Sequence, residues 1–102
     1  MIHVVAIITA KPGQREKILT AFRANVASVL AEVGCIEYSA AVDVSPELPF
    51  QSSFGNDTFL VIEKWESLDA LKAHAVAPHM QAYAAKVREH IASRVIHVMH
   101  SA

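Results

Sequence analysis

The chain has 102 residues, so we expect residues 1–102 to form a single domain. Hydrophobic residues make up 53% of the chain and charged residues 19%, against about 45–50% and about 25% in typical domains, and this apolar surplus predicts a subunit interface. Nine Lys and Arg against ten Asp and Glu, scattered without a basic run, argue against nucleic acid or an anionic membrane as the main partner.

The apolar stretch at the N-terminal end is too short to span a bilayer. It also lacks the basic leader and the small-residue cleavage site of a secretory signal, so we expect a cytoplasmic protein with no membrane partner. Cys35 is the single cysteine, which excludes an internal disulfide and a cysteine metal cluster. We expect it to be a small core residue.

The first half of the chain predicts a strand, a helix and a second strand. Residues 2–10 are rich in β-branched side chains and apolar on both faces, which predicts a strand covered on both sides. Apolar residues then recur at steps of three and four over 14–33, which predicts an amphipathic helix capped by Gly34. Residues 35–44 alternate again, with Ile36 and Tyr38 on the same face of a second strand.

The second half predicts a loop at 45–57, a strand at 59–66, two helical segments and a last strand at 93–100. Ser67 is a suitable N-cap for a short helix at 68–76, and Pro78 opens the second segment. The order is therefore β-α-β-β-α-β, the α+β split βαβ arrangement with helices on one face of an antiparallel sheet. A homodimer that buries the other face would account for the apolar surplus.

Three side chains between 63 and 74 could carry chemistry. Trp65 lies on the strand face that we place toward the helices, where it is either a core residue or a wall on which a flat molecule stacks. His74, in a mostly apolar stretch, is either hydrogen-bonded at the edge of the core or a general base, a substrate contact or a haem ligand. Glu63 could titrate near neutrality if buried, or pair with a histidine or a basic residue.

His79 follows Pro78 at the predicted start of a helical segment. It is either a residue at a kink or a neutral imidazole available as a proton acceptor. The two histidines lack zinc-site spacing and a third ligand, so we expect no metal site. There is also no Ser-His-Asp order, phosphate loop or dinucleotide fingerprint.

Three segments, GCIEY at 34–38, FLVIEKWES at 59–67 and AHAVAPHM at 73–80, resemble the antibiotic biosynthesis monooxygenase family. The resemblance implies ferredoxin-like subunits paired as a dimeric α+β barrel, with a pocket between sheet and helices. Some members oxidise quinols or polycyclic phenols with O2 and no metal or flavin, and others bind and degrade haem. An electron-rich phenolate can itself reduce O2, so the protein need only bind the ring, remove a proton and exclude water.

The resemblance implies that Trp65 stacks on an aromatic substrate and that His74 deprotonates or orients it. The remaining expected substrate-binding residues are His79, Glu63, Phe59 and Tyr83. Haem-degrading members carry an asparagine on the first strand, which residues 2–10 lack. The sequence therefore predicts, in this order, a cofactor-independent monooxygenase, a non-catalytic small-molecule-binding dimer, and a haem-binding or haem-degrading protein.

Overall fold

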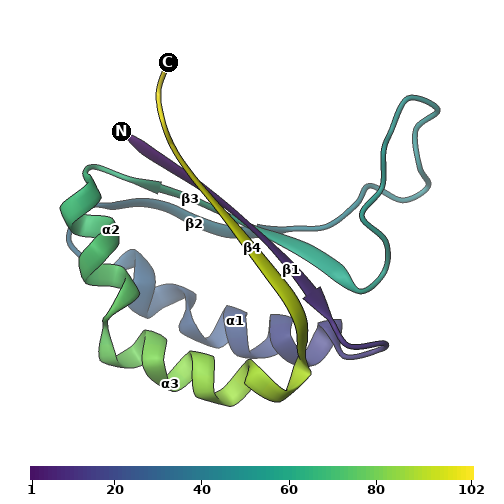
Figure 1. The fold of residues 1–102 in the computed structure, drawn as a ribbon, viewed down its shortest axis with the longest axis horizontal. Helices are drawn as coiled ribbons and strands as arrows, with labels where there is room; N and C mark the ends of the chain where they lie inside the picture. The colour runs from purple at the N-terminus through teal and green to yellow at the C-terminus, as the bar shows by residue number, and fades with distance from the viewer.

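A computed structural model describes residues 1–102, and the four strands form one antiparallel sheet in the order β2-β3-β1-β4 (Figure 1). The elements are β1 (Ile2–Ala10), α1 (Arg15–Leu30), β2 (Cys35–Ala41), β3 (Thr58–Trp65), α2 (Leu68–Ala75), α3 (Pro78–Val87), the 3-10 turn η1 (Arg88–His90) and β4 (Ile91–His100). The predicted α+β ferredoxin-like fold is confirmed. No helix is long and apolar enough to cross a membrane.

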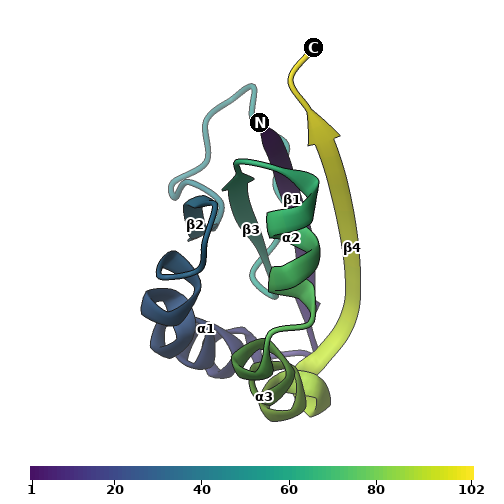
Figure 2. The same cartoon turned by 90° about the vertical axis from the view of Figure 1, so that its left-hand side faces the viewer.

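The helices all lie on one face of the sheet (Figures 1 and 2). Alternate residues of β1 are buried against them, while the residues between are half-buried on the other face. The outer face thus remains partly open within one chain, where the sequence predicts cover on both sides. It carries the apolar residues Val5, Ile7, Leu60, Ile62, Val95 and Met99.

The turn between α1 and β2 is tighter than the sequence predicts, since α1 ends at Leu30 rather than at 33. Val33, whose apolar side chain extends the predicted helix, is 91% exposed. Gly34 has a φ of +84°, and a Cβ at this position would lie 2.6 Å from the Cβ of Ala70. A glycine is therefore needed both for the backbone conformation and for the close approach of α2.

Strand β2 contains a bulge that the alternating pattern does not predict. The register against β3 shifts between Cys35 and Glu37, so Ile36 is left without a partner and is largely exposed. Tyr38 is buried against the helices, whereas Ile36, which was expected on the same strand face, is not. Cys35 is half-buried and packs against the core, which agrees with its predicted role. The strand ends at Ala41 instead of 44.

The chain between β3 and β4 follows the sequence prediction closely. The Ser67 hydroxyl accepts a hydrogen bond from the backbone N–H of Ala70 at 3.1 Å, which caps α2. Pro78 begins α3, where its missing N–H costs no helical hydrogen bond. This pair of short helices brings the C-terminal turn of α2 and one side of α3 over the sheet, where a cavity lies.

Candidate functional site

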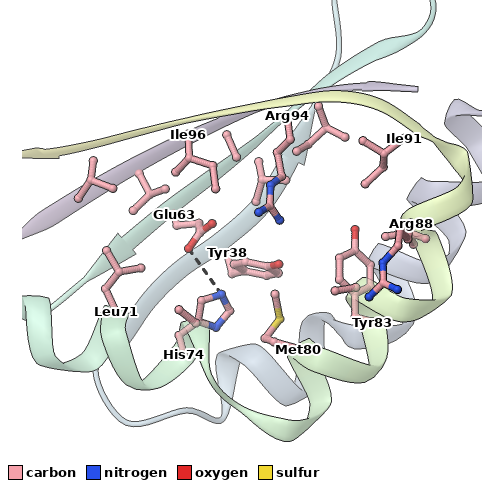
Figure 3. Close-up of a pocket in the computed structure, with 18 residues that line it drawn as sticks. Tyr38, Glu63, Leu71, His74, Met80, Tyr83, Arg88, Ile91, Arg94 and Ile96 are labelled. Carbon is pink, nitrogen blue, oxygen red and sulfur yellow. Dashed lines mark ion pairs between the residues drawn. The ribbon is translucent and has the colours of Figure 1, made fainter. Parts of the chain in front are cut away.

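A cavity of about 780 Å³ lies between helices α2 and α3 and the sheet (Figure 3). Ligand pockets of proteins usually have volumes of about 300–1,000 Å³, so the cavity has room for a small organic molecule. Of its 18 lining residues 14 are hydrophobic, which favours a flat apolar ligand. The other four are Glu63, His74, Arg88 and Arg94.

The imidazole of His74 lies between two carboxylates. Its Nδ1 is 2.8 Å from Oε2 of Glu32, and its Nε2 is 3.9 Å from Oε1 of Glu63. His74 is 5% exposed, so this arrangement is largely shielded from water. The contact with Glu32 favours the tautomer that carries its proton on Nδ1. Nε2 is then free to accept a proton on the side of Glu63 and the cavity.

Trp65 contacts both Glu63 and His74 but does not line the cavity. Its Nε1 donates a hydrogen bond of 2.9 Å to Oε1 of Glu63, and its ring centroid lies 4.7 Å from that of His74. Glu63 and Trp65 are two residues apart on β3, so their side chains project from the same face of the strand. The indole is fully buried and has no face toward the cavity. This placement corrects the sequence expectation that Trp65 stacks on a substrate.

Burial raises the pKa of Glu63 above its ordinary value, and the nearby charge of Glu32 acts in the same direction. The Trp65 hydrogen bond and the charge of His74 lower this pKa in part. The net result is a carboxylate that binds a proton more readily than a free glutamate does. A buried carboxylate with a raised pKa, next to an imidazole, is suited to accept a proton near neutral pH.

We expect the raised pKa of Glu63 to make stability depend on pH. Between about 4.5, the ordinary value, and the raised folded value, the native state binds more protons than the unfolded state. The free energy of unfolding of the wild type should therefore fall relative to that of Glu63→Gln as pH rises through this window. Urea unfolding of both proteins from about pH 4 to about pH 8 measures the difference. A constant difference across this range would contradict the raised pKa.

Two other predicted site residues lie outside the cavity lining. Phe59 is fully buried and packs edge-on against Phe22 of α1 at 6.3 Å between ring centroids. His79 Nε2 lies 3.2 Å from Oε2 of Glu32, within ion-pair distance, although its ring nitrogens make no hydrogen bond. Glu32 thus faces both histidines. That Phe59 and His79 contact a ligand stays a prediction, and such a contact would need a ligand that reaches beyond the present cavity lining.

Tyr83 lines the cavity, as the sequence analysis expects of a ligand-binding residue. Burial raises the pKa of Tyr83 to about 12, so its hydroxyl stays protonated and can donate a hydrogen bond. Tyr38, which sequence reasoning missed, also lines the cavity, with its ring 5.6 Å from that of His74. Glu32 was missed as well, because it lies 42 residues before His74 in the sequence and no local pattern connects them.

The chain thus combines an antiparallel α+β fold with an apolar cavity lined by a carboxylate–imidazole pair. Residues 1–86 match the family model described as antibiotic biosynthesis monooxygenase. The chain is 38% identical over 101 residues to Probable quinol monooxygenase YgiN of Escherichia coli, covering 97% of this chain and 96% of that protein. The chain therefore belongs to the antibiotic biosynthesis monooxygenase family.

Solved structures agree with this assignment at the level of the fold. PA3566 from Pseudomonas aeruginosa superposes with a TM-score of 0.82 at 26% identity, covering 99% of this chain and 93% of that one. A crystal structure described as an antibiotic biosynthesis monooxygenase gives a TM-score of 0.81 at 22% identity, covering 100% and 99% of the two chains. The family resemblance stated from the three sequence segments is confirmed.

Proposed function

We propose that the protein is a cofactor-independent monooxygenase that oxidises a quinol-like or phenolic aromatic with O2. The observation that carries the proposal is the Glu63–His74 pair, which opens onto an apolar cavity of about 780 Å³. The cavity supplies room for the ring, and the pair supplies a proton acceptor. The similarity to a protein named as a probable quinol monooxygenase supports this choice of substrate class.

In the proposed reaction the apolar walls hold the ring and exclude water, and Nε2 of His74 removes a proton from the substrate hydroxyl. Glu63, with its raised pKa, accepts the same proton or stabilises the imidazolium that forms. The phenolate then reduces O2 directly. One oxygen atom enters the ring and the other leaves as water, and the quinol provides the electrons for both. Trp65 acts as a positioning residue through its bond to Glu63.

The contacts of His74 favour this proposal over haem binding. Its Nδ1 is engaged by Glu32, and a second carboxylate stands 3.9 Å from Nε2, on the side from which an iron atom would approach. The volume of the cavity likewise speaks against a non-catalytic dimer whose pocket is filled by side chains.

The test is O2 uptake by purified protein with a reduced naphthoquinol, corrected for the spontaneous rate. We expect a protein-dependent rate that saturates with quinol, and a product that carries one labelled oxygen atom from ¹⁸O2. A rate equal to the spontaneous one, or a product without label, would contradict the proposal. Removal of metals with a chelator before the assay should leave the rate unchanged.

We propose further that the subunit forms a homodimer through the outer face of its sheet. That face carries half-exposed apolar side chains, and exposed apolar patches of this kind mark interaction sites. Sedimentation equilibrium at micromolar concentration should give twice the mass of the 11.1 kDa chain. A single subunit under these conditions would contradict the dimer.

A further inference from the structure

Two arginines line the same cavity (Figure 3): Arg88 lies beyond Tyr83, away from the Glu63–His74 pair, and Arg94 extends from β4 between Glu63 and Tyr83 in this view. Arg94 comes from β4 and pairs across the sheet with Ile8, and Arg88 follows α3 in η1. Glu63 instead pairs with Val4, and Val4 with Val98. Arg94 and Val98 are four residues apart on one strand, which is about 13 Å. The backbone positions that carry Glu63 and Arg94 are therefore well separated along the sheet, and a ligand in the cavity can reach both the acid–base pair and the arginines.

Neither arginine has an acidic partner within the chain. The ion pairs of the molecule involve Arg23, Lys64 and three histidines, and none includes Arg88 or Arg94. Neither guanidinium makes a hydrogen bond to another protein group. A guanidinium stays charged at any physiological pH. Both arginines are exposed side chains in the cavity lining, so their two positive charges are available to a ligand.

The surroundings of Arg94 suit a carboxylate. Its guanidinium extends from β4 into the cavity and lies above the Tyr38 ring, between Glu63 and Tyr83 in the view of Figure 3. The charge of Arg94 acts on the Tyr83 hydroxyl, which stays protonated and can donate a further hydrogen bond. A guanidinium donates two parallel hydrogen bonds to a carboxylate, a geometry that a point charge cannot provide. A planar carboxylate conjugated to an aromatic ring also matches the flat, apolar walls.

We infer that the natural substrate is an aromatic acid, with its oxidisable hydroxyl at Glu63 and His74 and a carboxylate at the opposite end of the ring system, bound by Arg94 with help from Arg88 and Tyr83. This inference rests on the proposed function for the chemistry at the hydroxyl end. The carboxylate site itself requires no turnover, so it is tested by binding alone.

The binding test compares two stable phenols by isothermal titration calorimetry. One is 6-hydroxy-2-naphthoate, whose hydroxyl and carboxylate lie at opposite ends of the two rings, and the other is the corresponding naphthol without the carboxylate. We expect the hydroxynaphthoate to bind about tenfold or more tightly, since hydrogen bonds to charged groups contribute on this scale. Arg94→Gln should remove most of this preference, and Arg94→Lys should restore only part of it.

The matched control is Lys86→Gln, which removes one positive charge from an exposed position on α3 outside the cavity lining. It should keep the full preference for the hydroxynaphthoate. Equal affinities for the two phenols in the wild type would overturn the inference. A preference that survives in the Arg88→Gln, Arg94→Gln double variant would also overturn it. If the arginine variants alter only the sedimentation mass, the arginines belong to a subunit interface and the inference likewise fails.

The outcomes for the carboxylate site and for the proposed function are separable. If the hydroxynaphthoate binds through Arg94 but neither a neutral nor a carboxylated naphthoquinol drives O2 uptake, the monooxygenase proposal fails and the carboxylate site stands. If the neutral quinol is oxidised and a carboxylate brings no gain in affinity or in kcat/KM, the proposed function stands and the aromatic-acid inference fails.

Discussion

Replacing His74 with glutamine is expected to lower kcat/KM for quinol oxidation by about 100- to 10,000-fold, the usual contribution of a positioned general base. The amide can still hydrogen-bond to Glu32, but it cannot accept a proton as Nε2 of the imidazole does. The oxygen electrode assay with a reduced naphthoquinol measures the loss. Thermal unfolding of the variant shows whether the fold is preserved, because His74 is buried.

The matched control for this experiment is His100→Gln, an exposed histidine at the end of β4 that does not line the cavity. It should retain the wild-type rate. A folded His74→Gln variant whose kcat/KM stays within about threefold of the wild type would contradict the general-base role, since so small a change lies outside the range of lost proton transfer.

Trp65→Phe is expected to weaken the fold and to shift the pH dependence of activity. The phenyl ring cannot donate the hydrogen bond to Glu63, and leaving a buried charged acceptor without its donor costs about 1–3 kcal/mol. That bond lowers the pKa of Glu63, so its loss should raise the pKa further. The acid limb of the kcat/KM profile should therefore move to higher pH, because Glu63 must lose its proton to act. Urea unfolding and a pH–rate profile measure the two effects.

A double-mutant cycle with Glu63→Gln separates the effect of the Glu63 charge from the loss of indole packing. In the glutamine background the carboxylate no longer titrates, so Trp65→Phe should produce no shift of the acid limb. The stability loss that remains should be that of indole packing and of a neutral hydrogen bond, because the glutamine amide oxygen can still accept from Nε1 of Trp65. An acid limb at the same pH in the wild type and in Trp65→Phe would show that the indole does not affect the pKa of Glu63. Trp65 would then have a structural role only.

Sequence reasoning reached the fold because its signals are local. Each signal fixes the conformation of a short backbone segment. The signals are the β-branched run at Ile2–Ala10, the helical periodicity after it and the Ser67 cap. Alternation along β3 correctly placed Glu63 and Trp65 on the face toward the helices. The bulge at Ile36 was not predicted, because it depends on the register between β2 and β3. The sequence of β2 alone does not determine that register.

The sequence by itself thus determined the βαββαβ order, the family, and the short stretch that carries the Glu63–His74 pair. Only the tertiary structure decided which side chains reach the cavity. It brought Glu32 to His74 across 42 residues of sequence, buried Trp65 behind the pair, and turned Arg94 inward from β4. Such contacts depend on how separate elements pack, and residue spacing along one element does not contain that information.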